Sequence, residues 1–170
     1  MNTQAVLGLA GWSGVGKTTL SVHLIERLCS HGLKISTLKH AHHAFDVDTP
    51  GKDSYRHRHA GAGQVLVSSA NRWALMTEVK NTQELSLSMA LAHLDPCDLV
   101  LVEGFKQENF PKLELHRPAL GKPLLYGNVS GVEAIASDAP LALTACVPVI
   151  DLNDLGAIEA WVLARIEAQK

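Results

Sequence analysis

Gly11-Trp12-Ser13-Gly14-Val15-Gly16-Lys17-Thr18 is the stretch that decides the fold. It matches the Walker A pattern GxxxxGK[ST], directly after the apolar run Ala5–Ala10 and directly before a segment with apolar residues at helical spacing. A strand, a glycine-rich loop and a helix in this order form an anion site, because backbone N–H groups and the helix N-terminus point at the phosphates. The sequence therefore predicts that a nucleoside triphosphate binds here.

Each polar residue of this loop has an expected role. Lys17 supplies a point charge to the β- and γ-phosphates, which places it in the catalytic set, and the Thr18 hydroxyl ligates Mg²⁺. We assign the whole of Gly11–Thr18 and the adjoining Thr19 to nucleotide binding. The competing interpretation is a glycine turn followed by a Lys-Thr pair that merely begins a helix.

A second acidic element is expected at the end of another buried strand. Leu99–Val102 is continuously apolar and is followed by Glu103, while Asp98 stands at its other end. Ligands of doubly wound folds bind at the carboxyl ends of the strands. We therefore favour Glu103 over Asp98 as the residue that holds Mg²⁺ through water or orients an attacking water. The alternative is a solvated carboxylate.

The segment from Lys39 to Ser54 is dense in ionisable groups and follows a predicted strand, Leu33–Lys39. In a first interpretation it is a switch-like loop, in which Asp46 or Asp48 reaches Mg²⁺ and Lys39 or His40 reaches a phosphate or a partner substrate. A transition-metal site and a plain solvated loop are the two alternatives. We take Lys39, His40, Asp46 and Asp48 as nucleotide-site candidates, with Asp46 also as a metal ligand.

Base recognition is less clearly marked, because the Asn-Lys-x-Asp motif of many GTPases is absent. Asp138 follows the predicted strand Val132–Ala136 and occupies a comparable place. Its carboxylate is able to accept from guanine N1–H and the 2-amino group, which adenine does not offer. A plain Ser-Asp-Ala-Pro turn explains the same residues, so the motifs alone do not choose between GTP and ATP.

Composition indicates one soluble globular domain over residues 1–170. Apolar residues make up 46% and charged residues 19% of the chain, and the formal net charge is −2. This balance gives no basic field, so neither nucleic acid nor a membrane surface is an expected partner. Three widely spaced cysteines without a CxxC pair predict buried, reduced thiols and a cytoplasmic location.

The order of elements predicts an α/β fold, namely a doubly wound, mostly parallel sheet of the P-loop NTPase type. Short apolar strands alternate with helical segments, which is typical of parallel sheets covered on both faces. Residues 107–130 break this rhythm, because Lys112–His116 and Leu124–Tyr126 alternate around Pro118–Gly121. We expect a projecting β-hairpin there, covered by a second copy of the chain in a homodimer.

Several segments together resemble the MobB family, the molybdopterin-guanine dinucleotide biosynthesis adaptors. The resemblance rests on the Walker A loop and on Lys39-His40-x-His42-His43 continuing to Asp46-x-Asp48-x-Pro50-Gly51-Lys52-Asp53-Ser54, together with Arg72-Trp73-Ala74-Leu75-Met76 and Leu101-Val102-Glu103-Gly104-Phe105-Lys106. It spans nearly the whole chain.

This resemblance implies a GTP-binding, weakly hydrolysing homodimer that assists the guanylyltransferase joining GMP to molybdopterin. It implies GTP and Mg²⁺ as cofactors, with Thr18 and Glu103 at the metal. The His40–Asp48 stretch then faces the nucleotide or the partner enzyme, the region after Phe105 mediates dimerisation, and molybdopterin itself is a further candidate ligand.

Two rival functions remain. A small-molecule kinase moves the γ-phosphate to an acceptor and usually closes a lid that carries several arginines. Here Arg56 and Arg58 are the arginines that cluster between the loop and Glu103, and no long lid insertion is evident. A module that uses the nucleotide as a structural ligand is the other rival.

Overall fold

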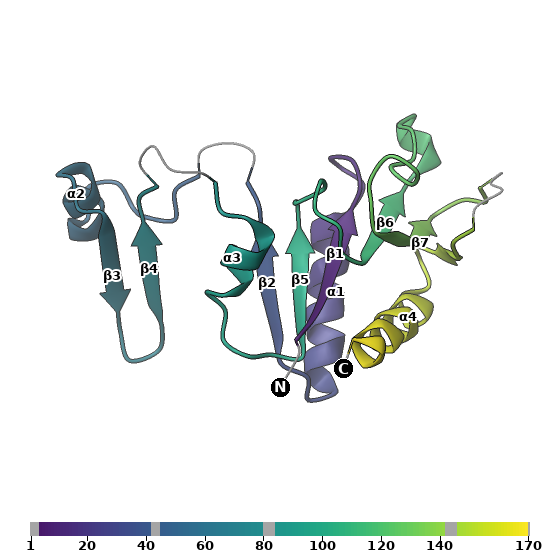
Figure 1. Cartoon of the computed structure of the whole chain (residues 1–170), viewed down its shortest axis with the longest axis horizontal. Coiled ribbons are helices and arrows are strands. Elements are labelled where there is room, and N and C mark those ends of the chain that lie inside the picture. Colours follow the sequence, from purple (N-terminus) through teal and green to yellow (C-terminus); the bar gives the residue numbers. More distant parts are fainter. Residues whose placement is uncertain (1–3, 42–44, 80–83, 142–145, 170) are drawn as a thin grey trace. The chain divides into compact units, whose positions relative to one another are not determined.

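The computed structural model describes residues 4–41, 45–79, 84–141 and 146–169. The chain divides into two compact units, Met1–His40 with Leu87–Lys170 (unit 1) and Ala41–Ser86 (unit 2), where the sequence suggested one domain. In Figure 1 the elements of unit 1 are β1 (Ala5–Ala10), α1 (Lys17–Ser30), β2 (Ile35–Lys39), α3 (Leu87–Leu91), β5 (Leu99–Glu103), β6 (Lys112–His116), the 3₁₀ turn η1 (Pro118–Leu120), β7 (Val132–Ser137), β8 (Val149–Asp151) and α4 (Leu155–Ala168). Unit 2 holds α2 (Asp53–His59), β3 (Gln64–Ser68) and β4 (Trp73–Thr77).

Unit 1 is built on a six-stranded sheet in the order β2-β5-β1-β6-β7-β8. Every pairing in it is parallel. The central strand β1 is apolar along its whole length, as a strand covered on both faces must be. The predicted α/β class with a parallel sheet is confirmed.

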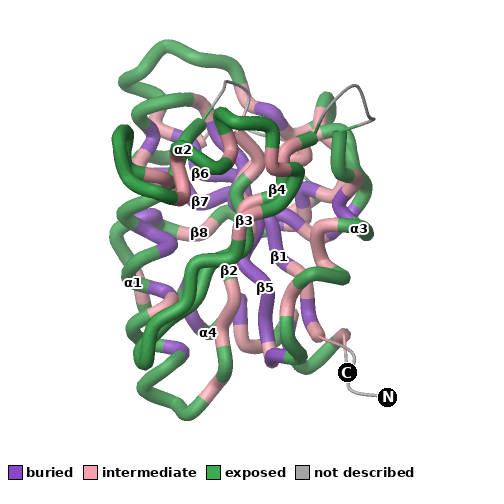
Figure 2. Tube along the Cα trace, turned by 90° about the vertical axis from the view of Figure 1, so that its left-hand side faces the viewer, coloured by how far each residue is buried: buried purple, intermediate pink, exposed green. Residues whose placement is uncertain are grey.

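Helices cover both faces of this sheet. On one face α1 and α4 pack over a core that includes Leu24, Leu28, Ile158 and Val162, all at most 1% exposed. On the other face Leu87 of α3 belongs to a smaller cluster with β5 residues. The strands β1 and β5 are correspondingly buried in Figure 2. The predicted doubly wound arrangement therefore holds within unit 1.

The predicted hairpin at residues 107–130 is wrong. Lys112–His116 forms β6, an interior strand between β1 and β7, and no second strand is assigned at 124–126. Its alternating polar residues suggested one wet face, but Lys112 and Glu114 are at most 1% exposed.

Backbone groups of the following loop satisfy these buried charges. The Lys112 ammonium donates to carbonyl oxygens including Ser130 O at 2.9 Å, and Glu114 accepts the N–H groups of Leu125 and Tyr126 at 2.7 Å. Burial raises the pKa of Glu114 and lowers that of Lys112. The loop thus replaces solvent over this part of the strand, which an alternating pattern alone does not reveal.

The antiparallel hairpin of this protein lies in unit 2. There β3 pairs with β4, so that Leu66 stands opposite Leu75 and Ser68 opposite Trp73. Helix α2 packs against β3. Leu66, Trp73 and Leu75 share one face of the hairpin and are 60%, 68% and 47% exposed, and Figure 2 shows both strands largely exposed.

The three cysteines are free thiols, and their burial differs from the expectation. Cys97 is buried, as predicted, but Cys29 and Cys146 are exposed. Cys29 lies on the outer side of α1, whose buried positions are Leu20, Ser21, Leu24 and Leu28. Apolar neighbours in the sequence therefore did not decide the burial of these two thiols.

Substitution of Gly131 tests how tightly the 117–131 loop closes on β6. Gly131 has φ +78°, and a Cβ there would stand 2.0 Å from the carbonyl oxygen of Phe110. We expect Gly131→Ala to lower the free energy of unfolding by about 3 kcal/mol, since strain and a backbone clash add. The control is Gly127→Ala, which has φ +88° but open space and should cost only about 1–2 kcal/mol of strain. Equal losses in urea unfolding of the two variants would contradict this packing.

Candidate nucleotide site at the carboxyl edge of the sheet

The Walker A loop joins β1 to α1, as the sequence predicts. Gly16 caps the helix with left-handed backbone angles, φ 105° and ψ 18°. Lys17 is the first residue of α1 and donates from Nζ to the carbonyl oxygens of Gly11 and Trp12, both at 3.0 Å. The N–H groups of the first helical turn have no intrahelical acceptor, so the loop offers donors and a fixed cation to a bound anion.

The charge of Lys17 is held in a partly buried place. Burial lowers its pKa, Glu103 opposes that effect, and the nearby ammonium groups of Lys106 and Lys39 lower the pKa further. Two further ammonium groups thus act on Lys17 near the loop, and Glu103 is the carboxylate that opposes them. This surplus of positive charge suits a polyanionic ligand.

Glu103 lies beside the first turn of α1. The Ser21 hydroxyl is 3.4 Å from Glu103 Oε1 and 3.0 Å from the Thr18 carbonyl oxygen. Thr18 and Thr19 are exposed at the start of the helix. Asp98 instead accepts the Lys34 N–H at 2.7 Å at the other end of β5. The structure thus brings Glu103, rather than Asp98, to the Walker A residues.

The end of β2 reaches the same place. Lys39 is in register with Glu103, and the His40 N–H donates to the Glu103 carbonyl oxygen at 2.8 Å. The His40 ring stacks on Phe105, with the ring centroids 4.5 Å apart. A Cβ at Gly104 would stand 2.6 Å from that of His40, so glycine permits this close approach. The structure thus brings Lys39 and His40 to Glu103, and their contact with a nucleotide stays a prediction.

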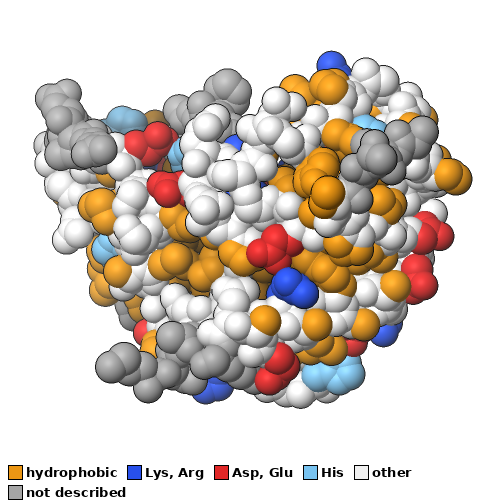
Figure 3. Space-filling model, turned by 45° about the vertical axis from the view of Figure 1, so that its right-hand side comes forward, with side chains coloured by type: hydrophobic (Ala, Val, Ile, Leu, Met, Phe, Trp, Pro, Cys, Tyr) orange, Lys and Arg blue, Asp and Glu red, His pale blue; other side chains and the backbone are white. Residues whose placement is uncertain are grey.

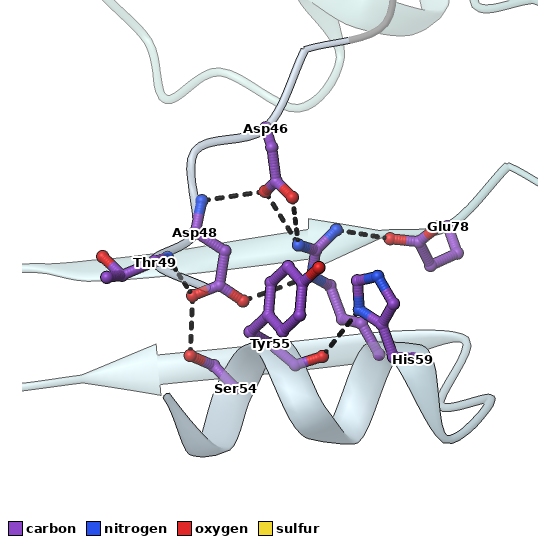
Figure 4. A network of polar contacts seen from close by, with 8 residues as sticks. Asp46, Asp48, Thr49, Ser54, Tyr55, His59 and Glu78 are labelled. Carbon is purple, nitrogen blue, oxygen red and sulfur yellow. Dashed lines mark hydrogen bonds and ion pairs between the residues drawn. The ribbon is translucent and has the colours of Figure 1, made fainter. Parts of the chain in front are cut away.

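Asp46 and Asp48 belong to unit 2, where both bind Arg58 (Figure 4). Arg58 donates to Asp46 at 2.7 Å and to Glu78 at 2.9 Å, and its side chain is only 12% exposed. Asp48 also accepts the Ser54 hydroxyl at 2.8 Å. These carboxylates thus organise unit 2, and their proposed role at Mg²⁺ stays a prediction. His42 and His43 lie outside the described residues.

Asp138 lies next to a small cavity at the ends of β7 and β8. The cavity has a volume of about 260 Å³ and is lined by Ser137, Asp138, Ala139, Pro140, Val149, Ile150 and Asp151. Typical sites for drug-sized ligands measure about 300–1,000 Å³. This space is somewhat smaller than that range, and it borders Asp138, the residue expected to contact the base.

Sequence reasoning missed Arg117, which directly follows β6. Its Nε donates to the Val15 carbonyl oxygen of the Walker A loop at 3.0 Å, and its Nη1 donates to Asp138 at 2.5 Å. The available signal was a basic residue after a strand, but the hairpin interpretation had placed that strand outside the sheet. Correct assignment of β6 would have placed Arg117 at the sheet's carboxyl edge.

Trp12 is a second residue whose surroundings were not anticipated. Its indole N–H donates to the Pro123 carbonyl oxygen at 2.7 Å, and the ammonium groups of Lys106 and Lys122 lie 5.6 and 5.8 Å from its ring centroid. Trp12 therefore connects the Walker A loop to the loop after β6.

Two features are absent from the part of the chain that the structure describes. Within those residues no three His, Cys, Asp or Glu side chains gather in a way that would hold a metal ion, so the transition-metal interpretation gains no support. No helix among the described residues has the length and apolar character needed to cross a membrane.

Comparison with known proteins identifies close relatives. Residues 6–138 match the family model described as molybdopterin guanine dinucleotide synthesis protein B. The molybdopterin-guanine dinucleotide biosynthesis adapter protein of Escherichia coli K12 is 44% identical over 167 residues, covering 96% of this chain and 94% of that protein. The protein of the same name from Haemophilus influenzae is 40% identical over 163 residues, covering 95% and 90%. The crystal structure of a MobB homologue from Bacillus stearothermophilus superposes with a TM-score of 0.70 at 25% identity, covering 99% of both chains.

Acid titration of Asp46 tests the Arg58 network. Hydrogen bonds from Arg58 hold the pKa of Asp46 below its ordinary 3.8. Because this folded-state pKa lies below that of the unfolded chain, the stabilisation of unit 2 is complete above about pH 4–5 and disappears as pH falls through the folded pKa. We expect Arg58→Ala to return the pKa of Asp46 toward 3.8 in carboxyl NMR titrations.

Arg56→Ala is the matched control, because Arg56 is on the same helix and its side chain is 75% exposed. It should leave the Asp46 titration unchanged. An Asp46 pKa that is the same in the wild type and in Arg58→Ala would show that the pairing is absent in solution.

Proposed function

The chain belongs to the MobB family, and from that premise we propose that it is a GTP-binding adaptor with weak GTPase activity. In this role it assists the guanylyltransferase that attaches GMP to molybdopterin during guanine-dinucleotide molybdenum cofactor biosynthesis. The observation that carries the proposal is the gathering of Lys17, Thr18 and Glu103 at the start of α1, within a chain whose relatives are named for this pathway.

The residues at this place fit a magnesium–triphosphate ligand. The loop and the α1 N-terminus bind the phosphates, and Lys17 turns from its two carbonyl acceptors to the β- and γ-phosphates. The Thr18 hydroxyl and the Glu103 carboxylate supply oxygen ligands, directly or through water, and Mg²⁺ commonly uses one or two carboxylates together with substrate phosphates. Bound Mg²⁺ would neutralise charge that develops on the phosphates.

Asp138 supports guanine as the base. It follows β7 directly and borders the cavity at the ends of β7 and β8. A carboxylate in this position accepts two hydrogen bonds from guanine N1–H and the 2-amino group, whereas adenine offers an acceptor at N1. We therefore propose GTP rather than ATP as the ligand.

Slow turnover fits the groups that surround the phosphates. Among the described residues, the hydrogen bonds of Arg117 reach Val15 and Asp138, and those of Arg58 hold the carboxylates of unit 2. Rapid P-loop hydrolysis usually needs an arginine at the transferred phosphoryl group and a residue that orients water. We propose that the partner enzyme, or molybdopterin bound to it, completes the site. We also propose that the protein works in the cytoplasm.

We propose that the homodimer forms through the β3–β4 hairpin rather than through residues 107–130. The face with Leu66, Trp73 and Leu75 is exposed although α2 packs against β3, and such an exposed apolar face is typical of a surface that binds another protein. Figure 3 bears on a different kind of partner, nucleic acid. On the face that it shows, Lys and Arg side chains lie apart among acidic and hydrophobic ones. That distribution does not resemble the basic stripe of a nucleic-acid binder.

Calorimetric titration with GTP and ATP, with and without Mg²⁺, tests the nucleotide site. We expect GTP to bind more tightly than ATP in the presence of Mg²⁺, and Lys17→Ala to weaken GTP binding by about 100-fold because a charge-assisted contact to phosphate is lost. Lys34→Ala is the control, since Lys34 is exposed at the opposite end of β2. ATP preference, or phosphate transferred to an added acceptor, would favour the kinase instead.

Sedimentation of charged variants tests the dimer surface. Trp73→Asp should shift the protein toward the monomer, because a carboxylate would be desolvated where the hairpin faces meet. Leu120→Asp is the matched control, being an exposed apolar residue, 42% exposed, in the originally expected hairpin region. A dimer that survives Trp73→Asp and dissociates with Leu120→Asp would return the interface to residues 107–130.

A further inference from the structure

Arg117 links the Walker A loop to the candidate base pocket. Strands β6 and β7 are parallel with His116 opposite Ser137, so Arg117 and Asp138 leave the two strands side by side. The guanidinium then reaches in two directions, from Nε to the Val15 carbonyl oxygen at 3.0 Å and from Nη1 to Asp138 Oδ2 at 2.5 Å. One rigid group thus spans the phosphate loop and the loop after β7.

The contacts of Arg117 restrict where its guanidinium group lies, and therefore where Asp138 lies. Val15 is 1% exposed and packs in the core, so its carbonyl oxygen has a fixed location. Arg117 also lies against the loop, because a Cβ at Gly16 would stand 3.8 Å from its Nη2 atom. The planar guanidinium permits little freedom once Nε and Nη1 are both engaged. Asp138 is therefore held at a set distance from the phosphate loop.

We infer that Arg117 is a positioning residue, which orients Asp138 for guanine recognition. This inference rests on the proposed GTP site. Arg117 donates to Oδ2 of the carboxylate. A carboxylate has about four lone-pair sites, so Oδ2 is able to accept from Arg117 and from the base together. Because Asp138 also lines the cavity, the hydrogen bond from Arg117 holds one carboxylate oxygen in place beside that space.

This geometry makes base preference depend on a residue that does not itself contact the base. Inosine triphosphate keeps N1–H but lacks the 2-amino group, so comparison of GTP with ITP isolates the second hydrogen bond. We expect the wild type to prefer GTP over ITP by roughly tenfold, as for one charge-assisted hydrogen bond. A freely rotating Asp138 would pair with either base through one oxygen, and the preference would shrink.

The experiment measures dissociation constants for Mg²⁺–GTP, Mg²⁺–ITP and Mg²⁺–ATP by calorimetry. We expect Arg117→Ala to reduce the GTP/ITP ratio to below about threefold, and Asp138→Asn to reduce it similarly. The double variant should lower the ratio no further, because both residues act through one interaction. Arg117→Lys keeps the charge without the planar fork and should also show the reduced ratio.

Arg165→Ala is the matched control. It removes a half-buried ion pair to Glu133 on β7, at 3.0 Å, and should leave the ratio unchanged. The ratio does not depend on the fraction of active protein, and Arg117→Lys carries the test if Arg117→Ala fails to fold.

The outcomes separate this inference from the proposed function. Loss of the preference in Asp138→Asn with full retention in both Arg117 variants would overturn the role of Arg117 and leave the GTP site standing. A lowered hydrolysis rate in Arg117→Ala with an unchanged ratio would also overturn it, since that is a catalytic role. Equal wild-type affinity for GTP and ITP would overturn guanine reading by Asp138 and Arg117 alike, whereas GTP binding independent of Lys17 would overturn the proposed site itself.

Discussion

The central strand β1 pairs in parallel with β5 on one side and with β6 on the other. Parallel strands bring their carboxyl ends to one edge, so this pairing alone places Gly11 between Glu103 and Arg117. The fit at that edge leaves little space, since a Cβ at Gly11 would stand 2.7 Å from the Leu115 carbonyl oxygen. The loop therefore packs closely on β6, and the residues proposed for the metal and for the base, Glu103 and Asp138, follow strands on opposite sides of β1.

Electrostatics at this edge then favour an anion. Burial is the main cause that lowers the pKa of Lys17; Glu103 opposes it, and the ammonium groups of Lys106 and Lys39 lower the pKa further by repulsion. Such repulsion is relieved when phosphates supply negative charge among the ammonium groups. The same sheet tolerates Lys112 and Glu114 in its interior because neighbouring backbone groups, rather than opposite charges, satisfy them. The charged groups at the candidate site thus remain accessible to a ligand, whereas those in the sheet interior, Lys112 and Glu114, are fully hydrogen-bonded to the backbone.

Much of this arrangement could be predicted from the sequence, because local signals and the sheet agree there. Three segments combine an apolar run with a polar residue at its end: the strand that leads into the Walker A loop, the strand that ends at Glu103 and the strand that ends at Lys39. Prediction failed at Lys112–His116, where alternation normally means one wet face but a later loop covers the polar side. That error hid Arg117, and it also moved the expected hairpin away from β3 and β4. Contacts between segments far apart in the sequence decide both the burial of β6 and the position of the hairpin. The periodicity within one segment carries no information about such contacts.

The position of unit 2 in the chain bears on how an adaptor would respond to its nucleotide. Unit 2 begins at Ala41, immediately after His40, whose N–H is bound to the Glu103 carbonyl oxygen. In the proposed function Glu103 attends Mg²⁺, so the residue that anchors the start of unit 2 is hydrogen-bonded to a metal-site residue. Within unit 2, Arg58 ties the incoming segment at Asp46 and Asp48 to Glu78 beyond the hairpin. The exposed apolar face of the β3–β4 hairpin thus belongs to a unit that begins, along the chain, directly after a residue of the candidate site.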